Sequence, residues 1–141
     1  MTDGASITGG CNCGAIRYTL STAPLAIVAC HCTSCRRQSG AAYSVNLLVR
    51  ADTMTTTGDL AKWTDTDTES GKPLSREFCG DCGSPIRSAP TATPKFLAVK
   101  AGTLDRPGAF APAMHIWTSS RLDWVTVPAD LPSFARGPEH A

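Results

Sequence analysis

Hydrophobic positions along the chain come in short runs, most of them rich in β-branched and aromatic residues. Turn-forming and small polar residues interrupt these runs, and the chain contains 12 Gly, 10 Pro and 17 Thr. Short runs of this composition between turn formers favour strands over helices. The pattern therefore predicts an all-β fold. Strands are predicted at residues 15–20, 25–29, 43–49, 54–57, 61–64, 75–78, 86–88, 96–101 and 114–118.

One segment departs from the strand pattern. Residues 33–39 are predicted to form a short helical turn. Thr33 or Ser34 can cap its start, because a side-chain oxygen accepts a hydrogen bond from an unpaired N–H of the first turn. Gly40 can end it in a left-handed conformation.

Polar and proline-containing segments predict the connections. Residues 65–72 are polar without periodicity, which predicts an exposed loop. Proline removes a donor from a strand ladder, so residues 89–94 and 105–112 are predicted to be surface connections. The tail at residues 135–141 lacks core-forming side chains and is predicted to fray.

Length and charge limit the class of protein. A chain of 141 residues predicts a single domain over residues 1–141. The formal net charge of +1 gives no electrostatic case for binding nucleic acid or an anionic membrane. The longest apolar stretch, residues 24–30, is far shorter than the roughly 20 residues that cross a bilayer, and residues 1–10 lack the pattern of an export signal. We therefore expect a cytoplasmic protein without a membrane segment.

The hydrophobic core is predicted to be thin. Leu, Ile, Val and Phe make up 25 of the 141 residues, below the roughly 20% at which globular cores become poor. Small domains with thin cores recruit disulfides or structural metals, and this chain has 7 Cys. An odd number of cysteines cannot all pair. In the reducing compartment expected here, clustered cysteines indicate metal ligands or redox groups.

Two of the three cysteine clusters have the spacing of a structural zinc site. Cys79 and Cys82 form a C-x-x-C pair followed by glycine, which is typical of a knuckle whose sulfurs face one ion. Cys11 and Cys13 lie two residues apart, so in an extended chain both side chains point to the same side. Together the four thiols predict a closed zinc site. The alternative is that one or both pairs are reduced structural cysteines or a redox dithiol.

The third cluster, Cys30, Cys32 and Cys35, places three thiols within six residues and leaves no fourth cysteine. Catalytic zinc sites keep three protein ligands and one open position. The cluster therefore predicts a second, potentially reactive zinc ion. His31 is a possible fourth ligand, but between Cys30 and Cys32 in an extended segment it is expected to face away.

Further polar residues near these motifs have two readings each. Arg36 and Arg37 follow Cys35 and could lower thiol pKa values and bind carboxylates of a substrate, or be solvated arginines of a short helix. Ser39 could contact a ligand or only cap the backbone. His115 lies in an apolar segment and is expected to be a hydrogen-bonded core histidine, with a base or ligand role as the alternative.

The cysteine motifs and their neighbours together resemble a known family. The resemblance is carried by Gly10-Cys11-x-Cys13-Gly14-x-Ile16-Arg17-Tyr18, Cys30-His31-Cys32-x-x-Cys35-Arg36-Arg37-x-Ser39-Gly40, Phe78-Cys79-x-x-Cys82-Gly83-Ser84-Pro85, Gly102-Thr103-Leu104-Asp105 and His115-Ile116-Trp117. Over about residues 8–132 the chain is similar to the glutathione-dependent formaldehyde-activating enzyme family, which includes centromere protein V-like members. The resemblance implies a tent-like fold of stacked antiparallel sheets around zinc.

By this resemblance, two zinc ions are expected with different duties. Cys11, Cys13, Cys79 and Cys82 would bind the structural ion, and the third cluster would bind a substrate-facing, catalytic one. The family's named reaction joins glutathione to formaldehyde to give S-(hydroxymethyl)glutathione and is classed with the carbon–sulfur lyases. The expected partner is therefore a small thiol such as glutathione.

Two hypotheses about function follow. In the first, the three-cysteine zinc and its arginines bind glutathione or another small thiol and promote formation or cleavage of a carbon–sulfur bond. In the second, both ions are structural and the chain is a carrier, scaffold or glutathione-binding module, which a fourth protein ligand on the second ion would favour. A zinc-dependent nucleic-acid adaptor is disfavoured by the balanced charge.

Overall fold

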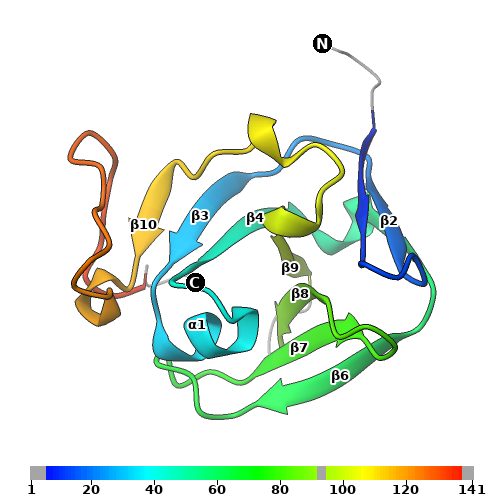
Figure 1. Cartoon of the computed structure of the whole chain (residues 1–141), viewed down its shortest axis with the longest axis horizontal. Coiled ribbons are helices and arrows are strands. Elements are labelled where there is room, and N and C mark those ends of the chain that lie inside the picture. Colours follow the sequence, from blue (N-terminus) through cyan, green and yellow to red (C-terminus); the bar gives the residue numbers. More distant parts are fainter. Residues whose placement is uncertain (1–5, 92–94, 138–141) are drawn as a thin grey trace.

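The strands form two sheets that pack around a shared hydrophobic core (Figure 1). The computed structural model describes residues 6–91 and 95–137. One sheet has the strand order β1-β2-β5, and the other has the order β10-β3-β4-β9-β8-β7-β6. The pairings are antiparallel except for β10 with β3, which is parallel. The all-β prediction, with stacked sheets and one short helix, is confirmed.

The elements have the following bounds. The three-stranded sheet contains β1 (Ile7–Gly10), β2 (Arg17–Leu20) and β5 (Met54–Thr57). The larger sheet contains β3 (Ala26–Cys30), β4 (Ser44–Arg50), β6 (Leu60–Asp65), β7 (Leu74–Cys79), β8 (Pro85–Pro90), β9 (Phe96–Lys100) and β10 (Met114–Ile116). The helical segments are α1 (Thr33–Ser39) and the 3-10 turns η1 (Ala51–Thr53), η2 (Ala101–Thr103), η3 (Pro107–Ala109) and η4 (Thr118–Ser120).

Side chains from both sheets fill the core. Tyr18 and Leu20 point inward from β2, and Leu47 and Val99 point inward from β4 and β9. Each such aliphatic side chain contributes about 1.5–3 kcal/mol to stability when fully buried. Cys79 belongs to the same core and is 1% exposed. One cysteine of the predicted knuckle is therefore also a packing residue.

Strand β1 was missing from the predicted strands, because two of its four residues are glycines with low strand propensity. In the fold, Gly9 pairs with Tyr18 of β2, and a Cβ at Gly9 would overlap the Tyr18 hydroxyl. That hydroxyl hydrogen bonds with Oγ1 of Thr103 at 2.7 Å. Glycine is therefore required here by the close approach of a tyrosine side chain.

The predicted surface connection at residues 89–94 is wrong at its start, because β8 continues to Pro90. Among the described residues, β9 pairs with β8 at Arg87 and Ser88 alone, so beyond Ser88 the described neighbour of β8 in the sheet is β7. Proline is tolerated at such an edge. Residues 92–94 lie outside the described residues.

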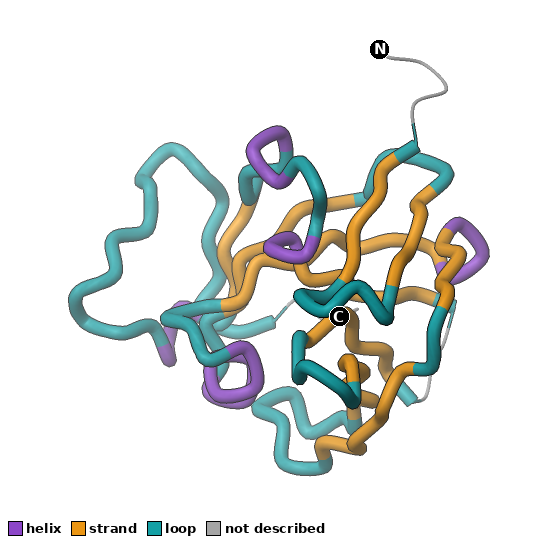
Figure 2. Tube along the Cα trace, turned by 45° about the vertical axis from the view of Figure 1, so that its right-hand side comes forward, coloured by secondary structure: helices purple, strands orange, loops and turns teal. Residues whose placement is uncertain are grey.

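Two more predicted loops differ from the fold. Asp65 belongs to β6 and is 3% exposed, although the segment 65–72 was predicted to be an exposed loop. In the tail, Ala135 accepts a hydrogen bond from the backbone N–H of Ser119 at 3.1 Å, so its described part is docked rather than frayed. Residues 138–141 lie outside the described residues. The docked tail closes a loop that extends past β10 at one side of the molecule (Figures 1 and 2).

The helical segments are short. None of those in the described part of the chain has the length and apolar character that crossing a bilayer requires.

Gly58 provides a test of the close packing within the three-stranded sheet, where the end of β5 meets the start of β2. It follows β5 with φ +93°, and a Cβ there would overlap the backbone oxygen of Ala15. We expect Gly58→Ala to lower the free energy of unfolding by at least about 2 kcal/mol, because it adds left-handed strain to a backbone overlap. Chemical denaturation measures the change. Gly102→Ala is the matched control, since a Cβ there meets no heavy atom within 4 Å; equal losses for both variants would contradict this explanation.

Candidate metal centres

The four-cysteine group brings together two segments that lie far apart in the sequence, and it consists of Cys11, Cys13, Cys79 and Cys82. The first two lie in the loop between β1 and β2, and the others at the end of β7 and in the turn before β8. Their sulfurs lie within 4.8 Å of one another, with Cys11 Sγ to Cys13 Sγ at 3.6 Å and Cys13 Sγ to Cys79 Sγ at 3.7 Å. Zinc–sulfur bonds of about 2.3 Å in a tetrahedron place sulfurs about 3.8 Å apart. The donor type and spacing therefore fit a tetrahedral thiolate-bound ion such as zinc.

Two similar backbone turns aim these sulfurs. Gly14 follows Cys13 and Gly83 follows Cys82, and both glycines have φ +82°. The N–H of Gly83 donates to the carbonyl of Cys79 at 2.8 Å, and the N–H of Ile16 donates to Cys11 Sγ at 3.2 Å. Left-handed glycines close the turns without a steric cost. The sequence pattern of cysteine followed by glycine thus has a direct geometric cause.

Ser84 joins the two turns. Its hydroxyl accepts a hydrogen bond from the backbone N–H of Asn12 at 3.1 Å and lies 3.3 Å from Cys82 Sγ. Hydrogen bonds from the side chain and backbone of Ser84 lower the pKa of Cys82 to about 5. The sulfur of Cys82 is thereby prepared as a thiolate, the form that binds metal.

Cys30, Cys32 and Cys35 form the three-cysteine group. Cys30 ends β3, Cys32 precedes α1 and Cys35 lies in its first turn, and all three are only 6–7% exposed. Their sulfurs lie within 4.8 Å of one another, and within the described residues no histidine or carboxylate atom joins them at that distance. Three convergent thiols fit a metal ion that has a further position for another ligand.

The start of α1 is built around one of these cysteines. Cys32 is the N-cap, and its Sγ accepts a hydrogen bond from the N–H of Cys35 at 3.2 Å. The predicted caps, Thr33 and Ser34, are wrong. That prediction assumed an oxygen acceptor at the start of the helix, whereas the acceptor is the sulfur of Cys32. The prediction for Gly40 is confirmed: it ends the helix with φ +66°.

Two buried cations lie beside the three-cysteine group. Arg76 of β7 donates from Nη1 to Cys35 Sγ at 3.8 Å, and Lys100 of β9 donates to the hydroxyl of Ser44 at 2.7 Å. Hydrogen bonds with Cys30 and Cys32, together with the positive charges of Lys100 and Arg76, lower the pKa of Cys35 to about 2. Burial in turn lowers the pKa of Lys100.

The sequence reasoning missed these two cations and considered Arg36 and Arg37 instead. Arg37 is exposed and lines a surface cavity, whereas Arg36 does not line it. A lysine that closes an apolar strand and an arginine within a predicted strand were the available signals. Neither indicates by itself which cluster the side chain will meet.

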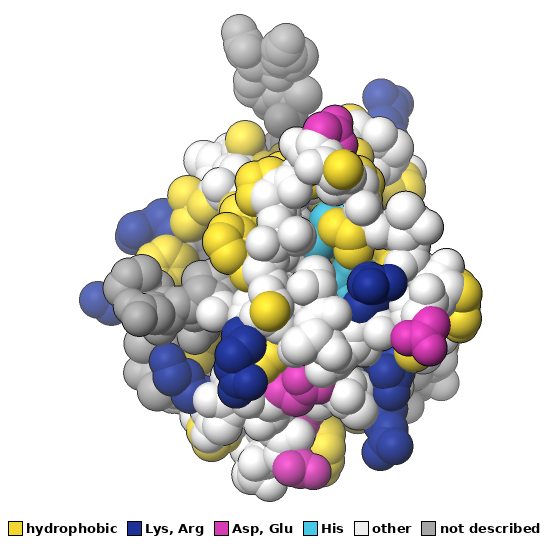
Figure 3. Space-filling view, turned by 90° about the vertical axis from the view of Figure 1, so that its left-hand side faces the viewer, with side chains coloured by type: hydrophobic (Ala, Val, Ile, Leu, Met, Phe, Trp, Pro, Cys, Tyr) yellow, Lys and Arg dark blue, Asp and Glu magenta, His cyan; other side chains and the backbone are white. Residues whose placement is uncertain are grey.

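His31 and His115 form a buried pair. His31 Nε2 lies 2.9 Å from His115 Nδ1, and Tyr43 packs on His31 with ring centroids 4.8 Å apart. Burial lowers the pKa of both histidines, so both are neutral at neutral pH. In Figure 3 histidine atoms show only through a small opening in the surface. His31 does not join the group of three sulfurs, and the expectation that His115 is a hydrogen-bonded core residue is confirmed.

Trp117 lies beside the three-cysteine group. It belongs to one buried hydrophobic cluster with the three cysteines and has the left-handed φ of 56°, which is uncommon for a bulky residue. The guanidinium of Arg136 lies 5.1 Å from its ring centroid, and a Cβ at Gly137 would come within 2.8 Å of its Nε1. The returning C-terminal segment therefore packs on the aromatic ring of this cluster.

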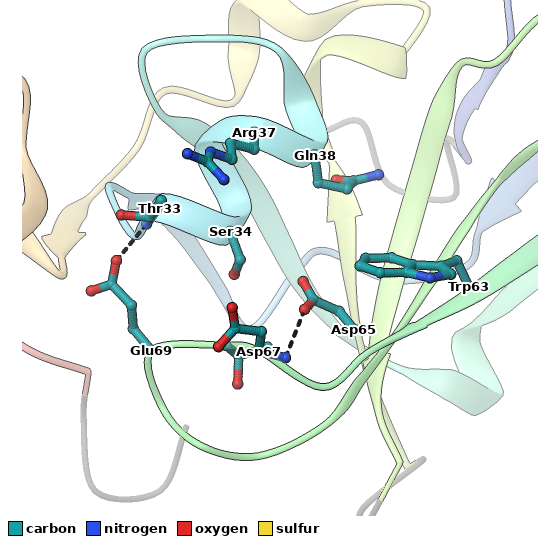
Figure 4. A pocket seen from close by; sticks show the side chains of 9 residues that line it. Thr33, Ser34, Arg37, Gln38, Trp63, Asp65, Asp67 and Glu69 are labelled. Atoms are coloured by element: carbon teal, nitrogen blue, oxygen red, sulfur yellow. Dashed lines mark hydrogen bonds between the residues drawn. The ribbon is translucent and has the colours of Figure 1, made fainter.

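A surface cavity of about 600 Å³ adjoins the start of α1 (Figure 4). Arg37 and Gln38 face it from the helix. Trp63, Asp67 and Glu69 face it from β6 and the following loop. Glu69 also accepts hydrogen bonds from the N–H of Thr33 at 2.5 Å and from the Ser120 hydroxyl at 2.7 Å. The cavity thus offers one cation, several carboxylates and an aromatic wall.

A second cavity, of about 410 Å³, lies between the two cysteine groups. Asn12 and Ser84 line it beside the four-cysteine group, while Tyr43, Ser44 and Lys100 line it beside the other. Within the described part of the chain, no cysteine lines either of these two cavities. In the larger cavity, Ser34 and Asp65 accept hydrogen bonds from Arg76, the arginine that contacts Cys35. In the smaller cavity, Lys100 is a positive charge that lowers the pKa of Cys35.

A family model described as "Glutathione-dependent formaldehyde-activating enzyme" matches residues 6–120, a range that contains all seven cysteines. The chain belongs to this family. A crystal structure of a Rhodobacter sphaeroides protein, a structural genomics target, matches with a TM-score of 0.53 and 18% identity, covering 89% of this chain and 98% of that chain. At this identity the match shows a shared fold. No curated protein matches the chain.

Membership of the glutathione-dependent formaldehyde-activating enzyme family agrees with what the geometry provides. The name of the family refers to a thiol and to formaldehyde. The two cysteine groups fit metal binding, and thiolate ligands suit zinc.

The two groups are expected to differ in their effect on folding. We expect the reduced protein to hold about two zinc ions. Cys79→Ser should unfold or aggregate the protein, because Cys79 lies in the core and closes a long loop to Cys13. Cys32→Ser should lose one ion and keep the fold, since its group spans six residues. Elemental analysis and circular dichroism measure both effects; full metal content in Cys32→Ser would contradict the assignment.

Proposed function

We propose that this chain is a zinc-dependent enzyme of the carbon–sulfur lyase type. Its substrate would be an adduct of glutathione, or a similar thiol, with formaldehyde or another small aldehyde. The observation that carries the proposal is the contrast between the two groups. One offers a complete tetrahedral set of four sulfurs, and the other offers three sulfurs flanked by buried positive charge.

The two groups would hold ions with different duties. Cys11, Cys13, Cys79 and Cys82 would hold a structural ion, and Cys30, Cys32 and Cys35 would hold the ion near which the substrate reacts. A metal with a free coordination position lowers the pKa of a bound thiol or polarises a carbonyl oxygen.

The reaction itself needs little covalent help from the protein. The thiolate sulfur adds to the aldehyde carbon, the carbonyl electrons move to oxygen, and that oxygen takes up a proton to become a hydroxymethyl group. The reverse direction breaks the same carbon–sulfur bond. Negative charge therefore passes from sulfur to oxygen, and fixed positive charge nearby stabilises both forms.

Residues of this chain are placed to supply that environment. Lys100 and Arg76 put positive charge beside the three sulfurs, and Lys100 also lines the cavity of about 410 Å³. Trp117 lies beside the group in one buried hydrophobic cluster. In a site of low water content these charges act more strongly than they would at the surface.

The cavity of about 600 Å³ suits the rest of a glutathione molecule. Glutathione carries carboxylates and an ammonium group. Arg37 is the cation available to a carboxylate there, and Asp67 and Glu69 are the anions available to the ammonium. Binding at this cavity would bring the thiol close to Ser34, the residue that separates the cavity from Arg76 and Cys35.

Glutathione binding tests the need for the three-cysteine group. We expect calorimetric titration to show binding to wild type and little or none to Cys32→Ser, because the thiol would lose its metal partner. A formaldehyde-dependent product assay should follow, measured against the uncatalysed addition. Equal binding to both proteins, at equal folded fractions, would contradict a role for this group in thiol binding.

The arginine pair on α1 tests the proposed cavity. We expect Arg37→Ala to raise the dissociation constant of glutathione about tenfold, because a charge-assisted hydrogen bond is lost. Arg36→Ala is the matched control on the same helix, since Arg36 does not line this cavity. The same calorimetric titration compares them. Weakening by both variants to the same degree would indicate a general effect of charge rather than this cavity.

A second candidate is a non-catalytic, zinc-stabilised binding or scaffold domain. It is favoured by the burial of the three sulfurs, which are 6–7% exposed, and by the absence of a cysteine from the two cavities of the described chain. Binding of glutathione without any rate above the uncatalysed addition would select this candidate.

A further inference from the structure

Arg76 is the most deeply buried charged side chain among the described residues, at 1% exposure. Its Nε and Nη2 both donate to Oδ2 of Asp65, at 3.2 and 3.1 Å. Nη2 also donates to the Ser34 hydroxyl at 2.9 Å. These contacts fix the plane of the guanidinium, because a fork of donors held at several points cannot rotate.

The remaining donor of this arginine faces a sulfur. Nη1 lies 3.8 Å from Cys35 Sγ and Nη2 lies 4.0 Å from it. Burying an arginine is costly unless its charge and its hydrogen bonds are satisfied. Asp65 balances the charge of Arg76 and accepts hydrogen bonds from its Nε and Nη2. Nη1, on the other side of the guanidinium, therefore has a good hydrogen bond only if the sulfur of Cys35 is a good acceptor. A thiolate is such an acceptor, and a neutral thiol is a weak one.

The charges around the group support this reading. Lys100 is 6% exposed, and among the described residues no carboxylate lies within 4.0 Å of its Nζ. With Arg76 and Asp65 already paired, Lys100 leaves one unpaired positive charge beside three sulfurs. Three thiolates around a divalent ion carry one net negative charge. The buried region is therefore electrically neutral when the group is loaded.

We propose that Arg76 is a positioning residue for the three-cysteine centre: held by Asp65 and Ser34, it orients Cys35 Sγ and weakens its electron donation to a bound metal ion. This inference rests on the proposed ion in the three-cysteine group and not on the reaction. Partners of ligand atoms generally fix the orientation of the ligand and tune the metal.

The four-cysteine group lacks an equivalent contact among the described residues. The donors to its sulfurs are neutral: backbone N–H groups, among them that of Ile16, and the hydroxyl of Ser84. A hydrogen bond from a guanidinium withdraws more electron density from sulfur than these neutral donors do. Arg76 therefore makes the ion in the three-cysteine group more electron-poor, which favours the binding of a further thiolate there.

Cobalt(II) in place of zinc tests the inference without measuring activity. Wild type and Cys32→Ser loaded with cobalt(II) would first be compared, and their difference gives the thiolate-to-cobalt absorption of the three-cysteine centre. The main variant is Arg76→Met combined with Asp65→Asn, which removes both charges of the buried ion pair together. Arg76→Lys keeps the charge but cannot contact Asp65, Ser34 and Cys35 together. Arg87→Met is the matched control, because it breaks the pair with Glu77, at 2.8 Å, in the adjacent strand.

We expect the Arg76→Met, Asp65→Asn protein to bind its second cobalt(II) about 10–100-fold more weakly, with the four-cysteine centre unchanged. Its thiolate-to-cobalt band should move to lower energy, because Cys35 Sγ donates more strongly without the guanidinium. Relative to the double variant, Arg76→Lys should recover part of the lost cobalt(II) affinity. It should recover a smaller part of the change in the energy of the band. A residue that only packs would change affinity or stability without moving the band.

The outcomes separate this inference from the proposed function. An unchanged band and an unchanged affinity, or changes equal to those in Arg87→Met, would overturn the role of Arg76 while leaving the metal centre in place. A wild-type protein that takes up one cobalt(II) ion only would overturn both. A shifted band in a protein without measurable rate on formaldehyde and glutathione would support the role of Arg76 and reject the enzyme.

Discussion

The fold depends on the meeting of two distant turns at the four-cysteine group. The loop after β1 belongs to the small sheet, and the turn after β7 belongs to the large one, so the group ties the sheets together. Cys13 and Cys79 are separated by 66 positions. A metal ion bound by all four sulfurs would close a loop of that length and remove about 4 kcal/mol of unfolded-chain entropy, whereas an ion in the three-cysteine group would remove about 2 kcal/mol. In a chain with few large aliphatic residues, the ion that we propose for the four-cysteine group would therefore stabilise the fold more.

The same comparison sets the three-cysteine group apart from the four-cysteine group. It contributes little to closing the chain, and its three sulfurs come from one short segment at the end of β3 and the start of α1. What distinguishes it is its environment. The four-cysteine group lies partly in solvent, because Cys13 and Cys82 are exposed, and the hydrogen-bond donors to its sulfurs are neutral. The other group is buried and bordered by positive charge.

Three directions of approach to the three-cysteine group have different chemical character. On one side Ser34 and Arg76 separate it from the larger cavity. On another, Ser44 and Lys100 separate it from the smaller cavity. Trp117 lies beside it in one buried hydrophobic cluster. A ligand that carries both charged and thiol groups, as glutathione does, meets a polar wall on each of the two cavity sides.

The sequence determined the all-β class and the division of the cysteines into four and three. These are local properties: strand propensity depends on short runs, and C-x-C and C-x-x-C spacings aim sulfurs whatever the rest of the fold does. It did not reveal β1, because glycine is required at position 9 by groups distant in the sequence, the Tyr18 hydroxyl and the backbone oxygen of Thr103. It placed Asp65 in a loop and considered Arg36 and Arg37 rather than Arg76 and Lys100. Only the tertiary structure decided which charges lie beside Cys35, because those charges come from β7 and β9, and the separation of residues along a chain does not determine the distance between them in space.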